Sequence, residues 1–137
     1  MARKILNSGT GVAIKELKER ARVGWIPVEA EGNVEVYVWT DDAGRTPHFH
    51  VKKYSSSNRP EWETCIKYES ADYFLHGKYR DRLPNTKLAK GLDKLFRTLN
   101  KDDPGRTYWQ TAIIAWNLNN STRKLPFDLE QSDYTKL

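Results

Sequence analysis

The stretch Val34 to Lys53, VEVYVWTDDAGRTPHFHVKK, decides the fold class of this chain. In its first part, 34–39, three valines alternate with Glu35, Tyr37 and Trp39, and successive side chains of a strand point to opposite faces. In its last part, 48–53, the polar residues His48, His50 and Lys52 alternate with Phe49 and Val51. Pro47 precedes this part, and a proline cannot donate to a ladder, so it is expected at the start of a strand. The polar residues Asp41 to Gly44 suit a tight reversal between the two parts. We therefore predict a hairpin in which 34–39 pairs antiparallel with 48–53.

Further strands are expected on both sides of this hairpin. Residues 61–68 alternate again and predict a third antiparallel strand, with a bent continuation through Tyr73 to Leu75. Residues 23–28 predict a strand that Pro27 confines to the edge of the sheet. Before it, the spacing of the apolar residues predicts a short helix over 12–22, with Ile14, Leu17 and Ala21 on one side.

Two helices are expected in the second half of the chain. Asn85 is a suitable N-cap for a helix whose apolar residues recur at helical spacing, namely Leu88, Leu92, Leu95, Phe96 and Leu99. Asp102 to Gly105, which contains Pro104, ends that helix. A second helix over 107–119 turns four residues inward, namely Trp109, Ala112, Ile113 and Trp116. We predict an α+β fold: a three- or four-stranded antiparallel sheet, two C-terminal helices packed on one face, and the short N-terminal helix.

Length and composition limit the class of protein. A chain of 137 residues suits a single domain covering 1–137, whose polar ends, 1–11 and 122–137, are expected to be flexible. No apolar run approaches the roughly 20 residues of a membrane span, and the N-terminus lacks a signal-peptide core. We therefore expect a cytoplasmic protein with no membrane partner. The net charge of +5 permits an anionic partner, although the same charge can serve solubility alone.

The motif Pro47-His48-Phe49-His50-Val51 carries a family resemblance, together with Ala115-Trp116-Asn117-Leu118 and the later Lys124-Leu125-Pro126. Over residues 33–126 the chain resembles a family of small bacterial proteins with a PHFHV signature, which is known as a domain of unknown function. The resemblance implies a compact α+β domain and a role in toxin–antitoxin or mobile-element biology, and it supplies no reaction. The chain departs from the family in its N-terminal segment and in longer connections at 54–60 and 76–84.

The two histidines of this motif are the first candidate site. His48 and His50 share one strand face with Lys52, and their Cα atoms are expected about 6.5–7 Å apart. Imidazoles titrate near neutral pH, so the pair suits an acid and a base, or anion binding. A metal site would need a third ligand, for which His76, Asp41 or Asp42 are candidates. The third interpretation is structural, with both rings packed against aromatic residues. We predict no metal and no cofactor, because nothing in the spacing requires these candidates to converge on the pair. The single cysteine, Cys65, cannot form an internal disulfide or a zinc site of the thiolate type.

The second candidate site is cationic. Basic residues recur at steps of three and four along the first predicted helix, and we call them the cationic stripe: Lys87, Lys90, Lys94, Arg97 and Lys101. Arg80 and Arg82 precede the helix. Such a stripe suits a phosphate backbone, whose counterions are released on contact, although a run of charges more often forms only a solvated helix face.

Two functions follow from these sites, and the sequence leaves open whether the protein is an enzyme. The leading hypothesis is a small basic protein of toxin or phage type that binds or acts on RNA or DNA through Lys52, Arg82 and the cationic stripe. In its enzymatic form it is a metal-independent ribonuclease, with His48 and His50 as base and acid and with Arg80 or Lys52 stabilising the charged phosphate. The alternative is a protein–protein binding module, such as a phage inhibitor or toxin–antitoxin partner, that uses the aromatic residues at 25, 37, 39, 54, 62 and 68.

Overall fold

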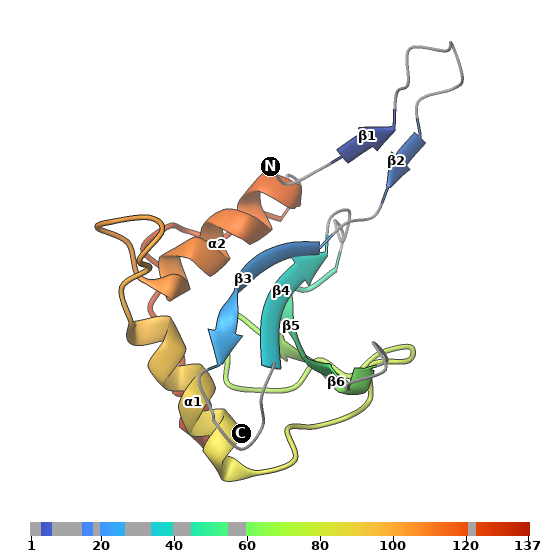
Figure 1. The fold of residues 1–137 in the computed structure, drawn as a ribbon, viewed down its shortest axis with the longest axis vertical. Helices are drawn as coiled ribbons and strands as arrows, with labels where there is room; N and C mark the ends of the chain where they lie inside the picture. The colour runs from blue at the N-terminus through green and yellow to red at the C-terminus, as the bar shows by residue number, and fades with distance from the viewer. Residues whose placement is uncertain are drawn as a thin grey trace.

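The protein is built on one four-stranded antiparallel sheet with two helices on the same side of it (Figure 1). A computed structural model describes residues 4–6, 15–17, 20–26, 34–39, 45–54, 60–120 and 123–137. The sheet has the order β3-β4-β5-β6, with the bounds β3 Arg20–Ile26, β4 Val34–Trp39, β5 His48–Tyr54 and β6 Pro60–Lys67. The helices are α1, Thr86–Arg97, and α2, Tyr108–Asn119. The predicted α+β class is confirmed.

The predicted antiparallel pairing of the central hairpin is confirmed. Val34 lies opposite Lys53, and Tyr37 lies opposite His50. The third predicted strand is also confirmed, because β6 pairs antiparallel with β5 and places Cys65 opposite His50. Strand β3 pairs with β4 at the other edge of the sheet, as predicted for 23–26, while residues 27 and 28 lie outside the described part.

The short N-terminal helix predicted over 12–22 is wrong wherever the structure describes it. Lys15–Leu17 is β2, which pairs with β1, Lys4–Leu6, in a separate two-stranded sheet, and Arg20 to Arg22 begin β3. The reason is tertiary, because Arg20 to Arg22 pair along β4 and strand pairing overrides a weak helical periodicity. Residues 12–14, 18 and 19, and with them Ile14, lie outside the described residues.

The core lies between the helices and the face of the sheet that carries Val36, Val38 and Phe49. Helix α1 begins at the predicted cap, where the Asn85 side chain accepts from the backbone N–H of Leu88 at 2.9 Å. The predicted apolar residues of α1 are buried with one exception. Leu99 is 65% exposed, because α1 ends at Arg97 and the backbone N–H of its C-cap, Thr98, bonds to the Leu95 carbonyl.

Helix α2 and the C-terminal segment complete this layer. Thr107 and Gln110 form a capping box at the start of α2, and its predicted inward residues, Trp109, Ala112, Ile113 and Trp116, are buried. The tail returns to the core, where Tyr134, in the 3-10 helix η2 (Tyr134–Lys136), is fully buried. A flexible tail over 122–137 was expected from its polar composition, and the burial of Leu125 and Tyr134 does not support that expectation for residues 123–137.

The opposite face of the sheet, which we call the outer face, is also covered. After β6 the chain turns back and Tyr73 bridges Ile66 in antiparallel fashion, so the expected bent continuation of β6 is in fact a return along its edge. The chain then crosses the outer face, where the ring centroid of Phe74 lies 4.9 Å from that of His48 and that of Tyr79 lies 4.6 Å from that of His50. Among the described residues, no helix has the length and apolar character to cross a bilayer.

Candidate functional site

His48 and His50 lie beneath the covering segment and are not at the surface. His48 is 0% exposed and His50 is 1% exposed. A catalytic pair that works on a nucleic acid requires partly exposed side chains on a concave surface, and neither side chain meets this requirement. The cause is the chain that returns after β6, because Phe74 donates its backbone N–H to the Cys65 carbonyl at 2.9 Å and so holds the cover against the sheet. The catalytic role of both residues stays a prediction that this geometry does not favour.

Backbone carbonyls orient two of the imidazoles. Nδ1 of His48 lies 2.8 Å from the Thr46 carbonyl oxygen, and Nδ1 of His76 lies 2.9 Å from the Phe74 carbonyl oxygen. A carbonyl only accepts, so Nδ1 carries the proton in each ring and Nε2 carries the lone pair. Both rings are therefore fixed in the tautomer that can donate electrons through Nε2.

The third imidazole is held by a carboxylate. Nδ1 of His50 lies 3.1 Å from Oε2 of Glu63, and Tyr37 donates its hydroxyl to the same carboxylate oxygen. The ring of His50 also contacts Cys65, whose Sγ lies 3.4 Å from Nδ1 and 3.5 Å from Nε2. A buried network of this kind fixes the position of the sulfur and of the ring together.

Three possible metal donors converge next to this network. One donor atom from each of His48, Cys65 and His76 lies within 4.8 Å of the other two. The structure thus brings His76 to His48, which sequence spacing could not require, while Asp41 and Asp42 lie outside the described residues. We call His48, His50, His76 and Cys65 the histidine cluster. Sequence reasoning missed Cys65 and Glu63, although strand alternation does place them on one face of β6.

The predicted cations near the histidines have partners of their own. Arg80 is exposed and donates Nε to the Gly77 carbonyl at 3.1 Å. The ammonium of Lys52 lies over the rings of Tyr54 and Tyr37, at 4.7 Å and 5.3 Å from their centroids. The role of Arg80 or Lys52 at a reacting phosphate stays a prediction.

The cationic stripe lies at the surface, as a binding face requires. All five of its residues are exposed, but Lys101, which was predicted to lie on the helix, lies beyond the end of α1 at Arg97. Arg97 donates Nε to Asp93 at 2.9 Å, and this hydrogen bond and the nearby charge raise the pKa of Arg97. Asp93 itself is 8% exposed and also accepts from the Gln131 side chain and the Tyr134 backbone N–H.

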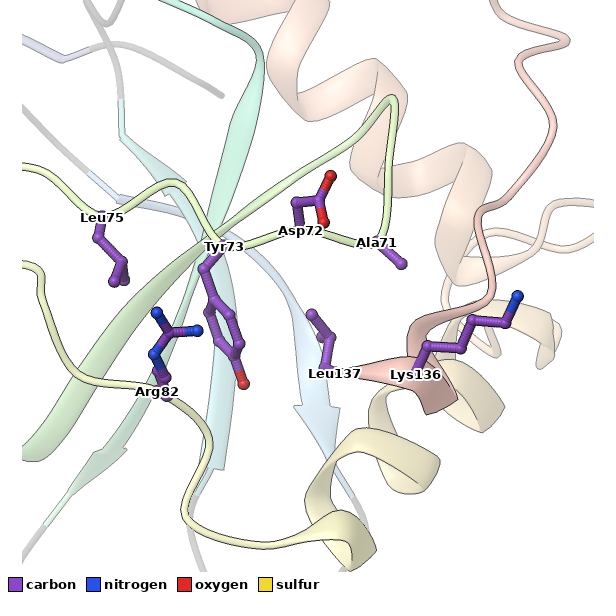
Figure 2. A pocket seen from close by; sticks show the side chains of 7 residues that line it. All are labelled: Ala71, Asp72, Tyr73, Leu75, Arg82, Lys136 and Leu137. Atoms are coloured by element: carbon purple, nitrogen blue, oxygen red, sulfur yellow. The ribbon is translucent and has the colours of Figure 1, made fainter.

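Two pockets, each of about 560 Å³, are lined by described residues of the chain. Figure 2 shows the first, where Arg82 lies over the ring of Tyr73 at 5.0 Å and the C-terminal Leu137 closes one side. The second lies at β3, and its lining includes Arg22, Trp25, Lys101 and Tyr108. None of the three histidines is among the described residues that line either pocket.

The aromatic residues proposed for a protein interface divide into two groups. Tyr37 and Tyr68 are fully buried, and burial together with Tyr134 raises the pKa of Tyr68 well above its ordinary value. Trp25 is 40% exposed, while Tyr54 lies beside it with ring centroids 6.2 Å apart. The buried tyrosines belong to the fold, so the aromatic count exaggerates the surface available to a partner.

In comparisons with known proteins, no family model, curated protein or solved structure matches this chain. The resemblance to the PHFHV family therefore stays a prediction, and so does the toxin, phage or mobile-element role that it implies.

Proposed function

We propose that this protein binds single-stranded nucleic acid, with the phosphate backbone along the cationic stripe of α1. The observation that carries the proposal is the charge distribution on this helix. Lys87, Lys90, Lys94 and Arg97 are all exposed, whereas Asp93, the one acidic residue of α1, is buried. The exposed charge of the helix is thus entirely positive.

A merely solvated helix face has a different composition. Such faces interleave acidic and basic residues at i,i+4, and each like-charged neighbour destabilises a helix by about 0.2–0.5 kcal/mol. The first turn of α1 also lacks the acidic residue that its N-terminal dipole favours. Within the described part of the chain, the stripe makes one ion pair, Arg97–Asp93. A bound polyanion relieves the repulsion between the like charges of the stripe. This favours a binding function over a charge that serves solubility alone.

The spacing of the stripe also suits a strand of nucleotides. Steps of three and four residues correspond to about 4.5–6 Å along a helix, so Lys87 to Arg97 spans about 15 Å. Four cations over this length can each contact a phosphate of a flexible single strand, and each contact releases counterions.

The pocket at β3 gives a reason to prefer a single strand. Lys101 ends the stripe and lines this pocket together with Arg22, Trp25 and Tyr108. Exposed aromatic rings beside cations stack unpaired bases without regard to sequence, and each stacked base contributes about 1–3 kcal/mol. A strand that follows α1 past Lys101 therefore reaches an aromatic platform. The proposal is binding without hydrolysis by His48 and His50, because both side chains are buried.

The experiment measures the salt dependence of binding to a labelled single-stranded RNA by fluorescence anisotropy. Four phosphate contacts predict a slope of log K against log salt of about −2.8, and K90Q/K94Q should reduce its magnitude by about 1.4. The matched control K78Q/K124Q removes the same charge from exposed sites outside α1 and should leave the slope nearly unchanged. An equal loss in both double variants would mean that only net charge matters, and the proposal would then be wrong.

A further inference from the structure

We propose that His48, Cys65 and His76 form a binding site for a zinc-type divalent metal ion beneath the turn at 76–79. The chain contains three histidines and one cysteine, and all four gather in the histidine cluster. The ring centroid of His48 lies 5.2 Å from that of His50 and 5.2 Å from that of His76. This convergence of β5, β6 and the turn at 76–79 is independent of the cationic stripe and of the proposed nucleic-acid binding.

The donor atoms select the kind of metal. Two imidazole nitrogens and one thiolate sulfur form a borderline-soft set that suits zinc and is poor for calcium or magnesium. Three protein donors leave a fourth position for water or another ligand, as in open zinc sites. A mixed site of this kind needs only the one cysteine, so the sequence argument against a thiolate-based zinc site does not apply to it.

The three donor atoms lie slightly farther apart than the donors around a bound zinc ion. Zinc bonds of about 2.0–2.3 Å in tetrahedral geometry place neighbouring donor atoms about 3.3–3.7 Å apart. The three donors lie within 4.8 Å of one another, so an ion requires a contraction of about 1 Å. Paired strands fix His48 and Cys65, while His76 stands on a turn that contains Gly77 at φ 53° and is held by hydrogen bonds between His76 and Tyr79. The turn is the part that can move.

The surroundings match those of metal-binding histidines. Such residues donate the second ring N–H to a backbone carbonyl or a carboxylate, which fixes the tautomer and raises the basicity of the ligating nitrogen. His48 and His76 each do this through Nδ1, to the carbonyls of Thr46 and Phe74. Because Nε2 then carries the lone pair in both rings, these two nitrogens are the expected ligands.

His50 is assigned a positioning role. Its ring contacts Cys65 Sγ at 3.4 Å and is itself held by Glu63 at 3.1 Å, so it keeps the sulfur directed at the site. Access for the ion is through the turn, because His76 is only partly buried, whereas His48 and Cys65 are fully buried.

The test uses cobalt as a spectroscopic probe and zinc for stoichiometry. The full chain, first stripped with a chelator and kept reduced, should bind one Co²⁺ per molecule and gain a sulfur-to-cobalt charge-transfer band in the near ultraviolet. Zinc should displace the cobalt, remain at one equivalent after dialysis, and raise the melting temperature. Mutating a residue that hydrogen-bonds to a metal ligand typically weakens metal affinity about 10- to 100-fold, and losing a ligand itself weakens it more. His76→Gln should therefore weaken zinc affinity by more than about 100-fold. His76 lies on a partly exposed turn, so this variant should fold.

Two further variants complete the test. Phe74→Leu changes a ring that packs on His48 and His76 without removing a donor, and it should retain one equivalent of metal and the charge-transfer band. Cys65→Ser, with its fold checked by circular dichroism, should lose the charge-transfer band. The proposal is overturned if the wild-type protein gives no such band at one equivalent, or if H76Q binds zinc as tightly as F74L does.

Discussion

Replacing Asp93 with Ala tests how the C-terminal tail is held to α1. The Asp93 carboxylate accepts hydrogen bonds from Arg97 Nε at 2.9 Å, Gln131 Nε2 at 2.9 Å and the backbone N–H of Tyr134 at 3.1 Å. These contributions are unequal. The Arg97 side chain is 58% exposed, and such a pair contributes about 0.5 kcal/mol. The Tyr134 N–H is buried, and leaving it unsatisfied costs about 1–3 kcal/mol.

The Gln131 hydrogen bond and the helix propensity at position 93 also change the free energy of unfolding. The bond from the partly buried Gln131 contributes about 1–2 kcal/mol, because its acceptor is charged. Alanine is the better helix former and returns about 0.6 kcal/mol. Asp93→Ala should therefore lower the free energy of unfolding by about 2–5 kcal/mol.

Urea unfolding followed by tryptophan fluorescence measures this loss. It also reports the tail directly, because Trp109 donates Nε1 to the Leu129 carbonyl at 2.8 Å. Asp103→Ala is the matched control, since this partly buried carboxylate pairs with Arg106 outside the helices and should change stability by less than about 0.5 kcal/mol. A loss below about 1 kcal/mol for D93A would refute the argument that this carboxylate fastens the tail.

Three other predictions concern the core, the helix caps and pH. Leu92→Ala should cost about 2–5 kcal/mol in denaturant melts, while Leu99→Ala, at a 65% exposed position, should cost less than about 0.5 kcal/mol; similar losses would contradict the assigned inward face of α1. Thr107→Ala removes half of the capping box of α2 and should cost about 1 kcal/mol, with Thr86→Ala as an exposed control in the same assay. Burial raises the pKa of Tyr68 and of Tyr134, so the folded state retains both protons when the unfolded state loses them. Stability should therefore be unaffected by these groups below about pH 10 and fall above it, and a flat profile from pH 9 to 11 would be inconsistent with this burial.

Most of the fold could be predicted from the local spacing of apolar residues, because that spacing indicates which side chains are buried. Val34 to Trp39 and His48 to Lys53 alternate with period two, and both form strands that pair antiparallel as predicted. Asn85 and the leucines that follow it identify α1 to within one residue at its start. The helix predicted over 12–22 failed because three apolar residues at helical spacing are a weak signal, and the pairing of Arg20 to Arg22 with β4 is a property of the whole sheet.

The site was harder to predict because it depends on long-range arrangement. Alternation correctly placed His48 and His50 on one face, yet it did not indicate that Phe74 and Tyr79 cover this face. His76 meets His48 through a reversal of the chain after β6 that spacing does not encode. In contrast, four members of the cationic stripe lie on one helix, and their exposure followed from the helical period, whereas Lys101 lies beyond the end of α1.

The return of the chain along β6 also determines how the sheet meets other molecules. An uncovered outer strand offers a row of backbone donors and acceptors to any extended peptide and so invites edge-to-edge polymerisation. Here the backbone N–H of Lys67 donates to the Asp72 carbonyl, and the Cys65 carbonyl accepts from the backbone N–H of Phe74. The Asp81 carboxylate accepts from the N–H of Glu63 at 3.3 Å. Since a carboxylate at a strand edge also repels an incoming carbonyl, β6 is closed to templated strand addition from Glu63 to Lys67. The chain segment that encloses the imidazoles thus also protects this edge of the sheet against amyloid-like strand addition.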